Sequence, residues 1–213
     1  MRLTIATCLA LLLPAPLAAA GPDDGVPLSR DEEFAMAVSA APDHLKDAVG
    51  VYVYGERGYE QARASSNGFN CLVQFGGGEM QMLSPTCWDR EGSETIMQRD
   101  LMYSRLREAG ETPEAIRRAI TEAYASGTLM APRKPGIAYM MSADFTRRNP
   151  ATGERVCIFP PHLMFYAPYA TNADLGINPA HVGTTDGPWI LGQGSPIAYV
   201  IVMPGGVDHS QCH

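Results

Sequence analysis

The residues best suited to binding or catalysis lie in the segment PPHLMFYAPY, residues 160–169, which holds three prolines, three aromatic residues and one histidine but no charge. Ligand pockets are mostly apolar and aromatic, with a few placed polar groups that orient the ligand. In this segment and the loop after it, such groups belong to His162, Tyr166, Tyr169, Thr171, Asn172 and Asp174. We therefore predict a small-ligand-binding module with an aromatic pocket around residues 160–174, in which these six residues contact the ligand.

The same segment also has the pattern of a buried strand. Neighbouring side chains on a strand point to opposite faces, so Leu163 and Phe165 share one face while His162 and Tyr166 share the other. Prolines at both ends would delimit such a strand, and burial is the usual role of aromatic side chains. We predict a strand that serves both purposes, with Leu163 and Phe165 in the core and the opposite face lining a depression closed by residues 171–174.

Two other functions remain as alternatives. A hydrolase would need a general acid–base pair, for which His162 and Asp174 are the best candidates, although twelve residues separate them. The common G-x-S-x-G and H-E-x-x-H motifs do not occur in the sequence. The third possibility is a structural or interaction protein of the cell envelope, which would have a flat apolar patch and no pocket.

The first twenty residues have the pattern of a signal peptide. A single basic residue, Arg2, precedes an apolar run that ends near Leu17 and is followed by Ala18, Ala19 and Ala20. The run is too short and too interrupted by proline to span a bilayer, which requires roughly 20 apolar residues. We predict a signal peptide over residues 1–20 and one soluble globular domain over residues 21–213, in the periplasm or secreted, without stable membrane insertion after cleavage.

The charge balance excludes nucleic acid as a partner. Without Arg2, fifteen basic residues remain against twenty-three acidic ones, a net charge of −8, and the basic residues are scattered along the chain. Such a surface repels phosphate backbones and anionic membrane surfaces. A small molecule is therefore the partner that we expect.

The four cysteines that remain after signal cleavage predict disulfides, as is usual in an exported chain. Of the three possible pairings, we predict Cys71–Cys87, which brackets a glycine-rich hairpin, and Cys157–Cys212, which would fasten the C-terminal tail. The cysteines are too far apart in sequence for a zinc site, so we expect no metal or other cofactor. His209 and His213 are four residues apart and would face the same side of a helix as a metal pair, but chain ends are usually frayed.

The rest of the chain predicts an α+β fold. Ser29 and Glu32 form a capping box before an apolar face at Phe34, and the acidic residues beside them are expected to act only as a cap. Helices are predicted from Ile96 to Ala109 and after Thr112, where Pro113 occupies the first position and Gly127 follows the end. Strands are predicted over residues 51–54, 59–63, 69–75, 136–142 and 197–203. We therefore predict a mostly antiparallel sheet packed against a helical hairpin, stapled by disulfides, in which the hairpin is a scaffold without chemistry.

Several stretches, covering most of the chain from about Glu33 to Val202, resemble a group of exported bacterial proteins with no assigned function. They are SNGFNCLV, PTCWDREGS, KPGIAYMMS, PPHLMFYAPYATNADLG and AYVIV. The resemblance implies a bacterial source and an exported location. It implies no activity, fold or catalytic residue, so the candidate residues above rest on their own chemistry.

Overall fold

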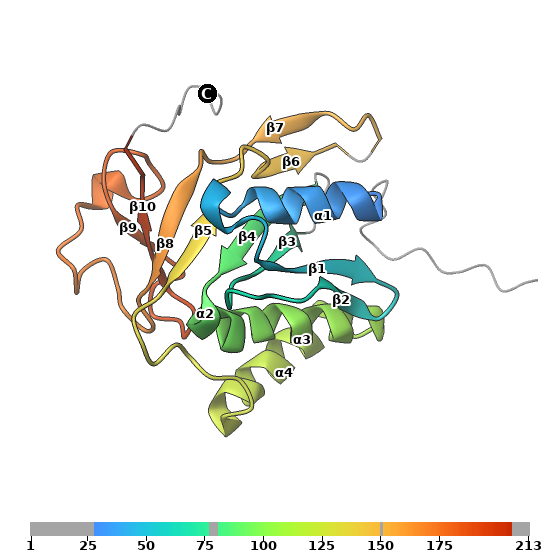
Figure 1. Ribbon diagram of the computed structural model, residues 1–213. Coiled ribbons are helices and arrows are strands. Elements are labelled where there is room, and N and C mark those ends of the chain that lie inside the picture. The colour runs from blue at the N-terminus through green and yellow to red at the C-terminus, as the bar shows by residue number, and fades with distance from the viewer. Residues whose placement is uncertain (1–27, 77–80, 150, 206–213) are drawn as a thin grey trace, which may run out of the picture.

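The computed structural model describes residues 28–76, 81–149 and 151–205, which form a mixed α+β fold around one large sheet (Figure 1). The helices are α1 (Arg30–Ser39), α2 (Arg90–Glu94), α3 (Ile96–Glu108) and α4 (Pro113–Ser126), with short 3-10 helices at Asp43–Leu45 and Pro179–His181. The strands are β1 (Gly50–Gly55), β2 (Gly58–Arg63), β3 (Asn70–Gly76), β4 (Gln81–Trp88), β5 (Ile137–Met140), β6 (Thr146–Arg148), β7 (Arg155–Cys157), β8 (His162–Tyr166), β9 (Trp189–Leu191) and β10 (Tyr199–Val202).

The strands form a ten-stranded sheet in the order β2-β1-β3-β4-β5-β8-β10-β9, and β6 joins β4 to β7 beside this row. Strands β1 and β3 are parallel, and the other pairs are antiparallel. This arrangement confirms the predicted fold class. The short strands β6, β7 and β9 were absent from the sequence prediction, because three residues carry too little alternation to be recognised.

Helix α1 covers one face of the sheet over β1, β3 and β4. Its capping box forms as predicted: the Ser29 hydroxyl accepts the Glu32 N–H at 3.2 Å, and the Glu32 carboxylate accepts the Ser29 N–H at 2.9 Å. The neighbouring Glu33 differs from the expectation of a solvent-facing cap. It is 3% exposed, and its carboxylate accepts the backbone N–H of Tyr54 in β1 at 2.8 Å.

The helical hairpin lies on the opposite face of the sheet (Figure 1). Ile96 and Met97 of α3 pack there against Leu72 and Trp88 of the sheet, and α4 packs on the outside of α3. The ends of α4 follow the sequence, with the Thr112 hydroxyl accepting the Ala115 N–H and Gly127 in the left-handed conformation at φ 78°. The hairpin therefore closes a second core on this face, and the side chains of α3 reach the sheet.

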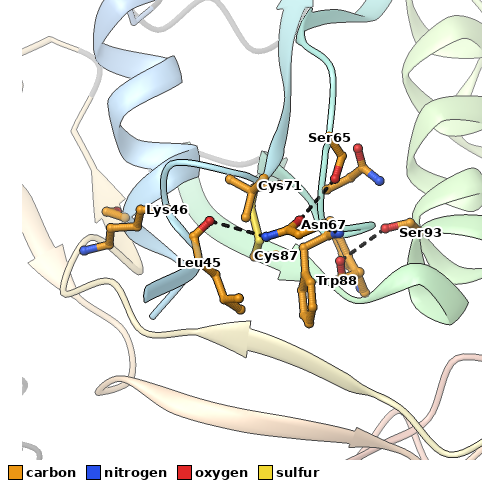
Figure 2. Close-up of a disulfide and its surroundings, with 12 residues drawn as sticks. Leu45, Lys46, Ser65, Asn67, Cys71, Cys87, Trp88 and Ser93 are labelled. Carbon is orange, nitrogen blue, oxygen red and sulfur yellow. Dashed lines mark hydrogen bonds between the residues drawn. A yellow bond between two sulfur atoms is a disulfide. The ribbon is translucent and has the colours of Figure 1, made fainter. Parts of the chain in front are cut away.

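A disulfide joins the two central strands of the sheet. Cys71 of β3 and Cys87 of β4 are directly opposite each other in the antiparallel register, with 4.0 Å between their Cα atoms. Figure 2 shows this bond beside the loop that precedes β3, where the Asn67 side chain donates to the backbone oxygen of Leu45. The first predicted disulfide is thus confirmed.

Several predictions fall on residues outside the described part of the chain. The signal peptide over residues 1–20 is one of them. The Cys157–Cys212 pair also involves such residues, and these two remain predictions. His209 and His213, whose spacing raised the question of a metal pair, lie outside the described residues as well.

Candidate functional site

The strand β8 has two faces as predicted, but the face turned to the core is the opposite one. His162 and Met164 are each 3% exposed, whereas Phe165 is 42% exposed. The inner face is the one covered by α2 and α3, where Met164 and Tyr166 join the second core. Alternation identifies two faces without showing which one the helices cover, so the predicted assignment of Leu163 and Phe165 to the core was wrong.

A cavity of about 560 Å³ lies on this inner face. Its walls come from α3 and from β3, β4, β5, β8, β9 and β10, together with loop residues between them. Most of the lining is apolar or aromatic and includes Ile96, Met140, Phe145, Phe159, Met164 and Trp189. This volume and lining are typical of pockets that hold small organic ligands.

One wall of the cavity carries a buried polar network centred on Asp100 of α3. The Oδ1 atom of Asp100 accepts hydrogen bonds from Nε of Arg99, at 2.8 Å, and from its Nη2. The Oδ2 atom accepts the side-chain amide of Gln74 in β3 at 2.6 Å. The carboxylate is only 5% exposed, so these bonds replace the water that it loses on burial.

The network extends from Gln74 into β4. The Gln74 side-chain oxygen accepts the hydroxyls of Ser84, at 3.4 Å, and Thr86, at 3.2 Å. Burial alone would lower the pKa of Arg99, but Asp100 reverses this effect and raises the pKa above its ordinary value. The wall is therefore a neutralised ion pair held in place by neutral hydrogen-bonding groups.

Tyr199 of β10 adds a second polar position to the cavity. Its hydroxyl oxygen accepts the indole N–H of Trp88 at 2.8 Å. Because the indole can only donate, the hydroxyl hydrogen of Tyr199 is not used in this bond. Burial raises the pKa of Tyr199 well above its ordinary value, so the hydroxyl keeps that hydrogen.

His162 is the one predicted contact residue that lines the cavity within the described residues. Its Nδ1 atom lies 2.8 Å from the backbone oxygen of Pro160, which can only accept, so Nδ1 carries the proton in this bond. The ring packs edge-on against Phe159, with 5.1 Å between the ring centroids. Burial lowers the pKa of His162, despite the bond to Pro160, and favours the neutral ring.

Tyr166 lies on the same face of β8 as His162 but has a different role. Its hydroxyl is 2.8 Å from both Oδ1 of Asp89 and the backbone oxygen of Ile137. Asp89 also caps α2 by accepting the Gly92 N–H, and its other oxygen accepts the Ile137 N–H. Tyr166 therefore joins β8 to β5 and to the start of α2, and it is not among the residues that line the cavity.

The remaining predicted contacts form a local loop structure outside the cavity lining. Oδ2 of Asp174 accepts both the backbone N–H and the hydroxyl of Thr171 at 2.8 Å, and these bonds lower its pKa. Asn172 accepts the Ile190 N–H at 2.7 Å, and Tyr169 is 60% exposed with φ 65°. The loop thereby anchors the start of β9.

The proposed acid–base pair of a hydrolase is not assembled in this arrangement. The side-chain hydrogen bonds of Asp174 go to Thr171, and that of His162 goes to Pro160. Over residues 28–76, 81–149 and 151–205, no hydrogen bond joins His162 to Asp174.

Sequence reasoning missed Arg99 and Asp100, because the hairpin was expected to be a scaffold only. Both come from α3 and line the cavity, and Asp100 accepts the side-chain amide of Gln74 in β3. The one signal was weak: Gln74 shares its face of β3 with Asn70 and Leu72, so it is a half-buried polar side chain on a partly polar face, and such a side chain needs a partner. The sequence did not show which residue that partner would be.

No protein-family model, curated protein sequence or solved structure matches this chain. Among the described residues, no cluster of three or more His, Cys, Asp or Glu side chains is arranged to hold a metal ion. The helices in the same part of the chain are all too short or too polar to cross a membrane. Any functional conclusion therefore rests on the geometry of the cavity.

Proposed function

We propose that this protein binds a small, largely apolar organic molecule in the cavity between α3 and the β5-β8-β10-β9 half of the sheet. The observation that carries the proposal is a cavity of about 560 Å³ with aromatic and aliphatic walls and a single polar wall. Apolar burial supplies most of the affinity of such sites, and a few polar groups orient the ligand.

The construction of the site supports a preformed binding pocket. The sheet that forms most of the lining is fixed by the Cys71–Cys87 disulfide between β3 and β4. Arg99 and Asp100 are held by hydrogen bonds to each other and to the sheet before any ligand enters. A preformed pocket loses little conformational entropy on binding, which favours affinity. The disulfide is also compatible with an oxidising extracellular location, where an exported binding protein would act.

The direct test uses N-phenyl-1-naphthylamine, an uncharged aromatic probe whose fluorescence rises in apolar surroundings. We expect saturable binding with one probe per chain. Failure to bind this probe or any neutral aromatic competitor would contradict the proposal, as would non-saturable binding with many probes per chain.

Two leucines of similar exposure provide matched variants that locate the bound probe. Leu191 is 47% exposed and lines the cavity, whereas Leu175 is 53% exposed and is not part of its lining. We expect Leu191→Asp to weaken probe binding about tenfold, because it introduces a charge at the apolar site, and Leu175→Asp to leave it unchanged. Circular dichroism melts of both variants show whether the fold is retained. Equal effects of the two substitutions would place the probe elsewhere.

A further inference from the structure

We infer that the ligand is uncharged and carries a hydrogen-bond acceptor, such as a ketone, ester or amide oxygen, that binds to Arg99 and Tyr199. This inference rests on the proposed function and specifies the ligand class of the same cavity.

The first argument is the charge balance of the lining. Arg99 and Asp100 are the charged residues of the cavity wall, and they form an ion pair. His162 adds no charge while its ring is neutral. An ionised ligand would therefore lose its hydration without meeting an unmatched opposite charge, which makes its burial unfavourable.

The second argument is the set of donors that the wall leaves available. Arg99 has five N–H donors, and its bonds to Asp100 use Nε and Nη2. No hydrogen bond to its third nitrogen, Nη1, is found within the described ranges. The side chain of Arg99 is 32% exposed and lines the cavity, so part of it is reachable from there.

Tyr199 supplies a further donor in the same cavity. Its oxygen is occupied by the Trp88 N–H, while its own hydrogen has no acceptor among the residues that the structure describes. Arg99 and Tyr199 both line this cavity. The two donors can therefore be matched by an acceptor of the ligand, and the apolar remainder of the lining accommodates a hydrocarbon body.

The test is competition against N-phenyl-1-naphthylamine by three ligands of nearly equal shape at pH 8. They are 2-acetylnaphthalene, with a neutral acceptor, 2-ethylnaphthalene, with no acceptor, and 2-naphthoate, with a negative charge. We expect the ketone to bind about tenfold more tightly than either of the others, since a hydrogen bond from a charged donor contributes about that factor. Equal binding of the ketone and the hydrocarbon, or tighter binding of the carboxylate, would overturn the inference and leave the proposed function intact. The two failures are distinguishable, because failure of the probe itself to bind counts against the proposed function.

Asp100→Asn provides a second readout on the same wall. It removes the negative charge, so the wall becomes cationic. The asparagine oxygen can still accept from Arg99, and its NH2 can donate to Gln74 once the Gln74 amide rotates to present its oxygen. We expect the affinity for 2-naphthoate, relative to the ketone, to rise about tenfold. Asp43→Asn is the matched control, because it makes the same change in net charge in the exposed Lys46–Asp43 pair. An equal gain in both variants would indicate a general charge effect and contradict a specific role of the Arg99–Asp100 pair.

The donor role of Arg99 is tested in the double variant Arg99→Met/Asp100→Asn, which leaves no unpaired buried charge. We expect the preference for the ketone over the hydrocarbon to fall to about twofold or less, with the remainder due to Tyr199. A preference that stays at the wild-type value while the fold is intact would exclude Arg99 as the group that recognises the ligand.

Discussion

The substitution Glu33→Gln isolates one buried carboxyl group whose ionisation opposes folding. Glu33 is 3% exposed in the core beneath α1, and burial raises its pKa from 4.5 to about 7, against the opposing effect of the hydrogen bond from the Tyr54 N–H. A glutamine has nearly the same shape, and its side-chain oxygen can still accept that N–H. The substitution therefore removes the titration and retains the packing.

The sign and size of the effect follow from proton linkage. Between pH 4.5 and 7 the folded protein binds more protons at Glu33 than the unfolded chain does, so its stability falls as the pH rises through this window. Each pKa unit corresponds to 1.36 kcal/mol, so the raised pKa corresponds to a loss of about 3 kcal/mol by pH 8. The glutamine variant lacks this loss.

The assay is urea unfolding of wild type and variant at pH 5, 6, 7 and 8. We expect the variant to gain about 3 kcal/mol on the wild type across this range, with the change complete near pH 8. The lowered pKa of His162 acts equally in both proteins and cancels in the difference. Glu32→Gln is the control, because the pKa of the exposed Glu32 is lowered by its hydrogen bonds with Ser29. Its effect on the free energy of unfolding would therefore vary with pH in the opposite direction, and only below pH 4.5. A stability difference between wild type and Glu33→Gln that does not vary with pH would refute the reasoning.

Three further variants test the packing of the sheet. Replacing Cys71 and Cys87 together by alanine should destabilise the protein by about 3 kcal/mol, because the disulfide closes a loop with a sequence separation of 16. Thermal or urea unfolding measures the loss of stability, and a loss below about 1 kcal/mol would contradict the prediction. Met164→Ala should cost about 2–4 kcal/mol and Phe165→Ala about 1 kcal/mol or less, since Met164 is buried and Phe165 is 42% exposed. The reverse order in urea unfolding would restore the face assignment suggested by the sequence alone.

Local sequence signals were sufficient for the helix ends and for the first disulfide. The capping box at Ser29 and the Thr112, Pro113 and Gly127 signals depend on hydrogen bonds within a few residues, and each forms as expected. The Cys71–Cys87 pair lies between two adjacent antiparallel strands, whose register places the two residues directly opposite each other. Such features were predictable because no distant segment takes part in them.

Predictions failed where the answer depends on which surface another element covers. The alternation in β8 was correct, but the position of α2 and α3 decides that His162 and Met164 are on the inner face. In the same way, Glu33 looked like part of a helix cap until the approach of β1 brought the Tyr54 N–H to its carboxylate. The periodicity of side chains along a strand or helix defines its two faces. Which of the two faces is buried depends on how the other elements pack against it.

The polar wall of the cavity was the least predictable part because its members come from distant parts of the chain. Gln74 and Asp100 are separated by 26 residues, and Trp88 and Tyr199 by 111. None of these residues forms a motif with its neighbours in sequence. Burial makes such groups costly unless a partner is found. The face of β3 that carries Gln74 also carries Asn70, Leu72 and Gly76, so its pattern does not single out Gln74. Only the packing of α3 against the sheet brings Asp100 to this side chain and creates the polar wall.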